Sequence, residues 1–326
     1  MSNDSRKTTK ATEGKGGHTP VMRQFFRAKE RYPDSILFFR MGDFYEMFYE
    51  DAVVVAADLE LTLTSRSKGP DGERIPMAGV PHHAAQGYIA ELLSRGHKVA
   101  ICEQMADPAT VKGVVPRDVV RVITPGLCLE PGALDARTHN YLLAVCVDDD
   151  AFAYAALELT TSELRVGSAP HRDALLSALW RFEPREVLVL GQSEFRDVVA
   201  KALPRAAVRI DAGADGDKLD EALARALATD DAQNTALQAG QAERRALGAV
   251  VRYAAEAEPQ RTIRFERLLR DDASASFVLD APAVQNLEIL RTLGGDRKGS
   301  LLHLVDHTVT AMGARLLRER LLAPSA

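Results

Sequence analysis

Apolar residues recur with helical or strand spacing through the first third of the chain. Thr19 followed by Pro20 suits a helix start, because Thr can cap the first amides and Pro fits the first turn. The helix that they open covers residues 21–32. Further strands are expected at residues 36–40, 97–105 and 118–126, and further helices at residues 50–61 and 82–96. We therefore predict one mixed-sheet α/β unit over residues 18–136, preceded by a polar, disordered tail at residues 1–17.

A second unit begins at Asn140 with three short apolar runs, which predict an antiparallel meander at residues 141–147, 151–159 and 163–169. A helix, a strand and a helix then alternate over residues 173–203. Strands followed by alternating helices and strands indicate an α/β domain of the ribonuclease-H type, which we assign to residues 137–262. Within it, residues 205–240 predict only a loop plus a helix, and residues 240–258 predict a helix.

From Leu279 onward the apolar spacing becomes helical. Residues 280–293 carry apolar side chains at helical intervals, namely Val284, Leu287, Leu290 and Leu293. Residues 310–324 also predict a helix. We assign residues 263–326 to the beginning of an all-helical domain. The apolar faces of these helices have no visible partner, so we expect roughly the last 45 residues to be loose or prone to aggregation.

The segment RMGDFYEMF, residues 40–48, places Phe44 and Glu46 two residues apart behind a Gly-Asp pair. If Asp43 caps a helix and Glu46 closes a capping box, the two side chains lie about 200° apart around the helix. If Gly42 and Asp43 form a hairpin turn, FYEMF is a strand and both side chains point to one face. We favour the hairpin, because FYEMF is rich in β-forming residues. Taken alone, the pair is most simply a core aromatic residue beside a solvated glutamate.

Composition and charge exclude several classes of protein. The chain has 46% hydrophobic and 27% charged residues, as an ordinary soluble globular protein does. Its net charge of -5 arises wholly after residue 140, so a nucleic-acid contact surface would have to be local. Cys102, Cys128 and Cys146 show no metal-binding spacing, which favours a reducing, cytoplasmic location. No run is long and apolar enough for a membrane helix, and we expect no membrane partner.

Several longer motifs, which follow one another along the chain, favour a functional role for Phe44 and Glu46 over a purely structural one. MGDFYEMFYEDA, IPMAGVPHHAAQGYI, KVAICEQMADP and VVRVITPG resemble, in this order, the mismatch-recognition domain of the bacterial DNA mismatch-repair MutS family. VQNLEI, followed by GSLLHLVDHTVTAMGARLLRERL, resembles the opening of that family's core (lever) domain. The resemblance is strong over residues 19–145 and 278–324, and it is weaker through the middle, which is similar to the family's connector domain.

The resemblance implies a role for each side chain of the Phe-x-Glu motif. In the family, the Phe inserts into the minor groove beside a mispaired or unpaired base, and the Glu contacts that base by a hydrogen bond. By position these residues are Phe44 and Glu46. The implied function is recognition of mismatches and small loops in duplex DNA during DNA mismatch repair. The resemblance also implies a MutL-type partner protein at the connector, a cytoplasmic, nucleoid-associated location and, for the full-length family, a homodimeric DNA-dependent ATPase that uses ATP and Mg.

Other residues of the first unit are weaker candidates. Arg66 and Lys68 lie in a polar loop, where they are either contacts to the DNA backbone or exposed cations. Met77 could line the groove or pack in the core, and we favour packing. His82 and His83 are adjacent, which is not the spacing of metal ligands, so we expect them to begin a helix and expect no metal site.

Two alternative functions are compatible with the same sequence. The chain could be a protein-interaction module whose connector docks a MutL-type protein and does not contact DNA. A ribonuclease-H-type metal nuclease is disfavoured, because the strand at residues 141–147 carries no carboxylate before Asp148.

GGDRKGS, residues 294–300, lacks the Gly-Lys-Ser order of a phosphate loop, so we predict no nucleotide site, no catalytic residues and no cofactor in this chain. The sequence stops early in the core domain, and we expect the family's ATPase domain to be missing.

Overall fold

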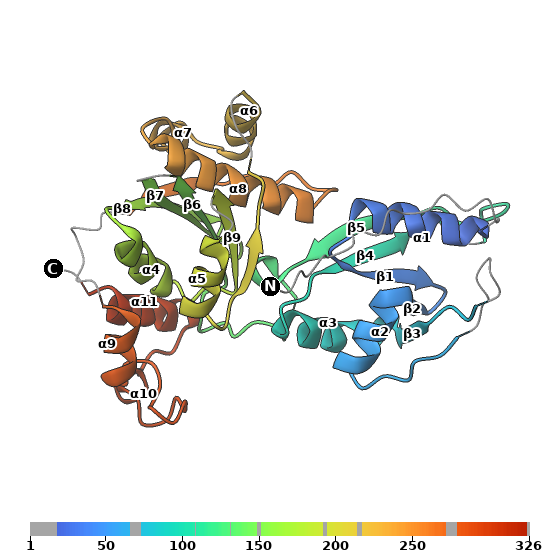
Figure 1. Ribbon diagram of the computed structural model, residues 1–326, viewed down its shortest axis with the longest axis horizontal. Helices are drawn as coiled ribbons and strands as arrows, with labels where there is room; N and C mark the ends of the chain where they lie inside the picture. The colour runs from blue at the N-terminus through green and yellow to red at the C-terminus, as the bar shows by residue number, and fades with distance from the viewer. Residues whose placement is uncertain are drawn as a thin grey trace, which may run out of the picture.

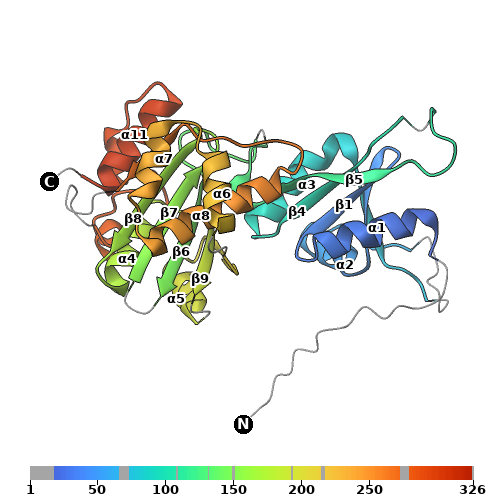
Figure 2. The ribbon, with the colours of Figure 1, turned by 90° about the horizontal axis from the view of Figure 1, so that it is seen from above.

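The structure of the protein is a computed structural model that describes residues 18–65, 73–107, 109–130, 132–148, 151–191, 194–213, 217–271 and 279–324. The tail expected at residues 1–17 and the loop cations Arg66 and Lys68 lie outside the described residues. Figure 1 shows a first sheet with its helices, a second sheet with its helices, and a helical segment beside the second sheet. Figure 2 shows that the two sheets lie end to end along the long axis.

The first part is a mixed sheet with the strand order β3-β2-β1-β4-β5. The strands are β1 (Ile36–Met41), β2 (Phe44–Phe48), β3 (Met77–Pro81), β4 (Val99–Gln104) and β5 (Arg117–Ile123). β1 runs parallel to β4, and the other neighbouring pairs are antiparallel. The sequence did not predict β3, because MAGVP is short and contains Gly and Pro, which are depleted in strands.

Helices cover both faces of the first sheet. α1 (Pro20–Arg31) lies on one face, and α2 (Tyr49–Asp58) and α3 (Ala85–Ser94) lie on the other. The expected cap is present, since the Thr19 hydroxyl accepts a hydrogen bond from the Met22 amide at 3.3 Å. A 3₁₀ turn over His82–Ala84 precedes α3, and a second 3₁₀ turn over Pro125–Leu127 follows β5.

The second part is a mixed sheet with the strand order β10-β9-β6-β7-β8-β11. Its strands are β6 (Tyr141–Asp148), β7 (Ala151–Glu158), β8 (Glu163–Ala169), β9 (Glu186–Gly191), β10 (Ala207–Ile210) and β11 (Arg267–Arg270). β6, β7 and β8 form an antiparallel meander, β9 is parallel to β6, and β10 is parallel to β9. This arrangement confirms the expected ribonuclease-H-like α/β unit.

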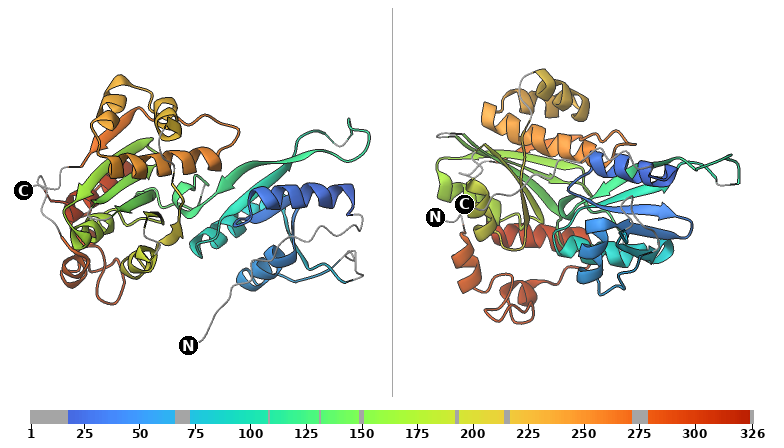
Figure 3. Two further views of the ribbon diagram at one scale, coloured as in Figure 1. Left: turned by 45° about the horizontal axis from the view of Figure 1, so that its top comes forward. Right: turned by 45° about the vertical axis from the view of Figure 1, so that its right-hand side comes forward.

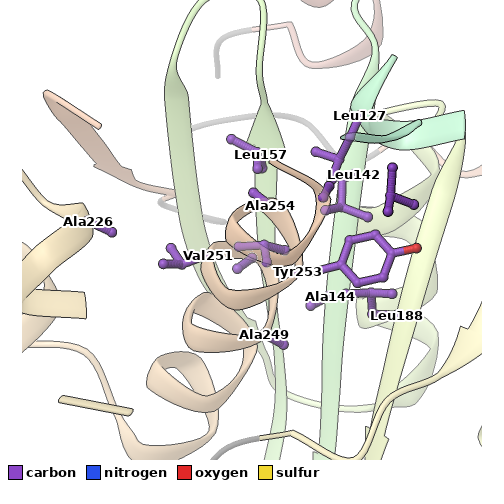
Figure 4. Packing of buried hydrophobic residues seen from close by; sticks show 14 of the residues in the cluster. Leu127, Leu142, Ala144, Leu157, Leu188, Ala226, Ala249, Val251, Tyr253 and Ala254 are labelled. Carbon is purple, nitrogen blue, oxygen red and sulfur yellow. The ribbon is translucent and has the colours of Figure 1, made fainter. Parts of the chain in front are cut away.

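Helices also enclose the second sheet. They are α4 (Arg172–Trp180) and α5 (Phe195–Ala202) on one face, and α8 (Gln241–Ala257) on the other, with α6 (Asp217–Ala226) and α7 (Asp230–Leu237) beside α8. Figure 3 shows both layers from two further directions. In Figure 4, Ala254 of α8 lies beside Leu157 of the sheet, and the Tyr253 ring lies beside Leu142 and Leu188. This cluster also contains residues of the first sheet, so the two parts share one core.

Two segments of the second part differ from the sequence-based expectation. Residues 205–240 contain strand β10 and helices α6 and α7, not only a loop plus a helix. β10 is a four-residue edge strand without buried residues, which explains why it gave no apolar pattern. Residues 267–270, which the sequence assigns to the third domain, form β11 and extend the second sheet beside β8.

The third part is helical, as expected, and contains α9 (Ala281–Asn286), α10 (Leu301–Val305) and α11 (Ala311–Leu322). The single helix expected over residues 280–293 was wrong. The helix ends at Asn286, and Glu288 has a positive φ of 49°, which a continuing helix does not allow. As a result, Leu287 and Leu293 are 64% and 67% exposed rather than aligned with buried Val284 and Leu290. The expected looseness of this part stays a prediction.

Candidate nucleic-acid interface

The Phe-x-Glu segment lies in a hairpin, as we favoured. Gly42 and Asp43 form the turn between β1 and β2, and Gly42 has a φ of +61°, which favours glycine. Phe44 pairs with Met41, and Glu46 pairs with Phe39. Phe44 and Glu46 therefore lie in one strand, two residues apart, and project from the same face of the sheet.

The cover of this face decreases along β2 toward the turn. Phe25 of α1 contacts Phe39 and Phe48 edge-on, with ring centroids 5.7 and 5.2 Å apart. Phe48 is only 8% exposed beneath α1, Glu46 is half-buried, and Phe44 is 46% exposed. Phe44 thus lies where the helical layer ends, although the alternation along the strand is the same as for the buried aromatic residues.

The opposite face of the hairpin is firmly held. Tyr45 and Met47 are buried against α2 and α3. The Tyr45 hydroxyl donates a hydrogen bond to Glu103 of β4, and burial raises the pKa of this phenol well above its usual value. The Arg40 guanidinium lies 5.5 Å from the Tyr45 ring centroid and donates from Nε to the Gly42 carbonyl at 2.5 Å. These contacts fix the turn, and therefore the direction of Phe44.

The end of β1 next to the turn contacts the start of β5. Arg117 Nε donates to the Arg40 carbonyl at 2.7 Å, and its guanidinium lies 5.3 Å from the Phe39 ring centroid. On the other side, the His82 amide donates to the Asp43 carbonyl at 2.9 Å. Contacts from both flanks therefore limit the movement of the turn.

The other predicted residues take the following positions. Met77 is 5% exposed and packs in the core, as we favoured. His82 and His83 are exposed and begin the 3₁₀ turn before α3, so they start the helical segment as expected. No group of three or more potential metal-binding side chains occurs among the described residues. Sequence reasoning missed β3 and with it Gly79, which pairs directly with Glu46.

Cys102, Cys128 and Cys146 are buried. Burial raises the pKa of the Cys102 thiol to about 12, and it also raises the pKa of Cys128. A protonated, enclosed thiol is a poor nucleophile. Cys102 and Cys128 therefore belong to the core and not to a reactive site.

Carboxylates of the second sheet are engaged in structural contacts. Asp148, at the end of β6, forms an ion pair with Arg245 at 3.1 Å. Glu186 of β9 is fully buried and accepts hydrogen bonds from Thr124, Arg209 and Tyr253. The Thr124 hydrogen bond joins the two parts, and the other contacts lie within the second part. These paired carboxylates do not resemble carboxylates converging on a metal ion.

A cleft of about 980 Å³ lies at the junction of the two sheets. Its cations are paired with carboxylates: Lys98 with Asp34 at 2.6 Å, Arg209 with Glu186 at 2.7 Å and Arg252 with Asp211 at 2.5 Å. The cleft is therefore electrostatically balanced. At residues 294–300, the Ser300 hydroxyl caps the short helix α10 by accepting a hydrogen bond from the His303 amide.

Comparison with known proteins identifies the family of this chain. Residues 19–131 match the family model of MutS domain I, residues 140–264 match MutS domain II, and residues 282–326 match MutS domain III. The chain belongs to the MutS family. The Phe-x-Glu hairpin lies in its domain I, and the ribonuclease-H-like sheet lies in its domain II.

Curated relatives give the same family along almost the whole chain. It is 47% identical over 324 residues to the DNA mismatch repair protein MutS of Sorangium cellulosum, which covers 94% of this chain and 35% of the relative. The MutS proteins of Myxococcus xanthus and Brevibacillus brevis are 42% and 40% identical, over 94% and 92% of this chain and 35% and 34% of their own length. The chain thus spans about a third of the MutS relatives that it matches. None of its helices within the described ranges is long and apolar enough to cross a membrane.

Proposed function

We propose that this chain acts in DNA mismatch repair by recognising mispaired or unpaired bases in duplex DNA. In this proposal, Phe44 inserts beside the base as an apolar wedge, and Glu46 contacts the base by a hydrogen bond. The observation that carries it is an aromatic side chain, 46% exposed, beside a carboxylate on one face of a hairpin whose other face is buried. The names of the relatives support the repair role.

The energetics of insertion favour a mismatch over a normal base pair. An apolar wedge must partly unstack a base step, which costs a few kcal/mol and kinks the duplex. A mispaired or unpaired base is already poorly stacked, so the cost of insertion is lower there. The discrimination then comes from deformability and does not require contacts that identify each base.

Glu46 supplies a second criterion. A carboxylate close to the phosphates is repelled by them, which weakens binding to any duplex. A hydrogen bond from a base N–H compensates for this repulsion only where a base is displaced far enough to reach the carboxylate. Phe44 and Glu46 therefore act on the same event, because both depend on a base that leaves the stack.

The proposal also includes residues outside the hairpin and the partners of the complete proteins. We assign Arg66 and Lys68 to the DNA backbone, where cations position a protein without selecting a sequence. Net charge near zero in the first 140 residues implies weak binding by this part alone. A MutL-type partner, a homodimer, and the use of ATP and Mg are expected of the complete proteins in the family.

Fluorescence anisotropy at low salt tests the proposal, with one duplex that carries a one-base bulge and one fully matched duplex. The native chain should bind the bulged duplex about tenfold more tightly, which corresponds to about 1.4 kcal/mol. Phe44→Ala should remove most of this preference, because the wedge is gone. Leu237→Ala is the matched control, since Leu237 is 70% exposed on α7, far from the hairpin.

The contrary outcomes are clear. A native chain that binds both duplexes equally would reject mismatch recognition by this chain. A Phe44→Ala variant that keeps the native preference would reject Phe44 as the wedge while leaving recognition itself in place.

A further inference from the structure

We propose that Gly79 is a positioning residue for mismatch recognition, because its missing side chain leaves the space in which the sugar of the displaced nucleotide lies. This inference rests on the proposed function. Gly79 lies on β3 and pairs directly with Glu46, and Pro81, two residues later on the same strand, pairs with Phe44. We call the side chains of Phe44 and Glu46, together with the backbone at Gly79, the recognition surface.

The position of a Cβ atom at residue 79 shows how close Gly79 is to both functional side chains. Such an atom would lie 3.7 Å from Glu46 Cγ and 3.9 Å from Phe44 Cδ1. It would therefore contact the two side chains that the proposal assigns to the base. Any larger side chain would extend outward between them, since paired residues of an antiparallel ladder project from the same face.

Folding does not require glycine at this position. Gly79 does not have the left-handed backbone conformation that favours glycine. The nearest atom to an added Cβ is the Tyr45 carbonyl oxygen at 3.5 Å, which is an ordinary van der Waals distance. Glycine inside a strand is unfavourable, and it commonly marks a place where a ligand or another backbone approaches closely.

The surroundings indicate that the approach comes from outside the protein. Met77, two residues earlier on the same face, is 5% exposed under the helical layer, whereas Gly79 is exposed. β3 is an edge strand of the sheet. Beyond it, the one bridge that the described residues form joins Thr64 to Met77 and not to Gly79. The open position therefore borders Phe44 and Glu46 at the rim of the sheet.

A nucleotide fits this space for steric reasons. The minor groove is only about 6 Å wide, so a hairpin that inserts an aromatic side chain must approach both backbones of the duplex closely. When Phe44 enters the stack and Glu46 contacts the displaced base, the sugar of that base lies beside the two side chains. Gly79 provides the room for it, and a branched side chain there would hold the duplex away.

Two substitutions and one control test this inference in the full chain. Gly79→Val adds a β-branched side chain that strands favour, so the fold should be kept while the space is filled. Gly79→Ala adds only the methyl group that the backbone accommodates. Gly87→Ala is the matched control, because Gly87 is exposed on α3 at the opposite face and an added Cβ meets nothing within 4 Å. Urea denaturation should show no loss of stability for any of the three.

The binding measurements use anisotropy with the bulged and matched duplexes. Gly79→Val should reduce the preference for the bulge about tenfold, in the range expected for overpacking a close contact, and Gly79→Ala should reduce it less. Gly87→Ala should behave as the native chain. 2-Aminopurine beside the bulge reports base unstacking, and at saturating protein its fluorescence increase should be smaller with Gly79→Val than with the native chain.

Three other outcomes would contradict the role of Gly79 or the proposed function. If the native chain prefers the bulge and both Gly79 variants fold and keep that preference, Gly79 has no positioning role, although the proposed function stands. If Gly79→Val loses stability, Gly79→Ala decides, and native discrimination by that variant overturns the inference. If the native chain does not discriminate, the proposed function fails and the role of Gly79 fails with it.

Discussion

The negative charge of Glu46 should affect DNA binding in a way that can be measured separately from the shape of the site. It lies half-buried on β2, two residues from exposed Phe44, where a carboxylate would approach the DNA phosphates. We expect Glu46→Ala to increase affinity for the matched duplex about fivefold, which corresponds to about 1 kcal/mol of relieved repulsion. The preference for a bulge should decrease, because the hydrogen bond to the base is also lost.

Salt dependence distinguishes this electrostatic effect from a change in shape. Anisotropy titrations of native and Glu46→Ala chains at about 50 mM and 200 mM salt should show the difference shrinking as salt rises. Equal affinity of the two chains for matched DNA at low salt would contradict the role assigned to the carboxylate. Phe44→Ala serves as the comparison, since it removes an uncharged side chain from the same face.

The residues of the site were predictable from sequence only in part. FYEMF and its preceding Gly-Asp pair indicated a hairpin, and this prediction is confirmed. The sequence alone did not distinguish Phe44 from Phe39 and Phe48, because all three fit the alternation of a strand. Their exposure differs because α1 covers only part of the sheet, and the extent of that cover is a tertiary property.

At the scale of elements, the β1–β2 turn depends on Gly42. Its φ of +61° lies in the left-handed region, and an added Cβ would meet no atom within 4 Å. Gly42→Ala should therefore destabilise the chain through backbone strain alone, by about 1–2 kcal/mol. Urea denaturation monitored by circular dichroism measures this loss. Gly87→Ala, in a helix, should instead stabilise the chain slightly, and a Gly42→Ala variant as stable as the native chain would refute the strain.

Elements with regular periodicity were predicted well, and irregular ones were not. The β6–β7–β8 meander was evident because its strands are apolar and separated by short turns. β3 was missed because its pairing with β2, and not its own propensity, makes MAGVP a strand. The helix predicted over residues 280–293 failed for the opposite reason, since apolar spacing continued through a turn at Glu288 that breaks the helix.

At the scale of the whole molecule, Glu186 joins the two sheets. This buried carboxylate of β9 accepts from the Thr124 hydroxyl at 2.5 Å and from the Gly126 amide at 3.1 Å, both after β5. From its own part it accepts from Arg209 and from the Tyr253 hydroxyl, each at 2.7 Å. Besides the shared apolar core, this carboxylate therefore holds the first sheet in its position relative to the second.

Glu186→Ala should weaken the junction strongly, because it leaves the Arg209 cation without its buried partner. Loss of one member of such a pair typically costs about 3–5 kcal/mol. Hydrogen exchange of the amides at Gly126 and Leu127 should increase, and the thermal midpoint should fall. Glu221→Ala is the control, since Glu221 pairs with Arg225 on the exposed surface of α6. Unchanged exchange at Gly126 would exclude Glu186 as the joint.

Asp306 makes a second long-range connection, between the chain linking the two sheets and the helical segment. Its side chain is 4% exposed and accepts from Arg137 at 2.8 Å and from Arg297 at 2.6 Å. The pKa of this carboxyl lies well below its ordinary value of 3.8. The hydrogen bond from the Thr308 hydroxyl is the largest cause, and the hydrogen bond from the Arg137 guanidinium is the next. Because the folded pKa is lower than the unfolded one, the ionised carboxylate stabilises the fold.

The sign of the shift fixes the pH dependence of this connection. The stabilisation is fully present above the unfolded value of 3.8 and is lost as pH falls toward the folded pKa. Asp306→Asn should therefore lower the urea midpoint by a constant amount between about pH 5 and 8, and the difference from the native chain should shrink below about pH 4. Asp118→Asn is the control, because Asp118 and Arg31 form an exposed pair at 3.7 Å that contributes little. If the Asp306→Asn difference were independent of pH down to the acid transition, the ionised carboxylate would not be what joins the helical segment to the linker.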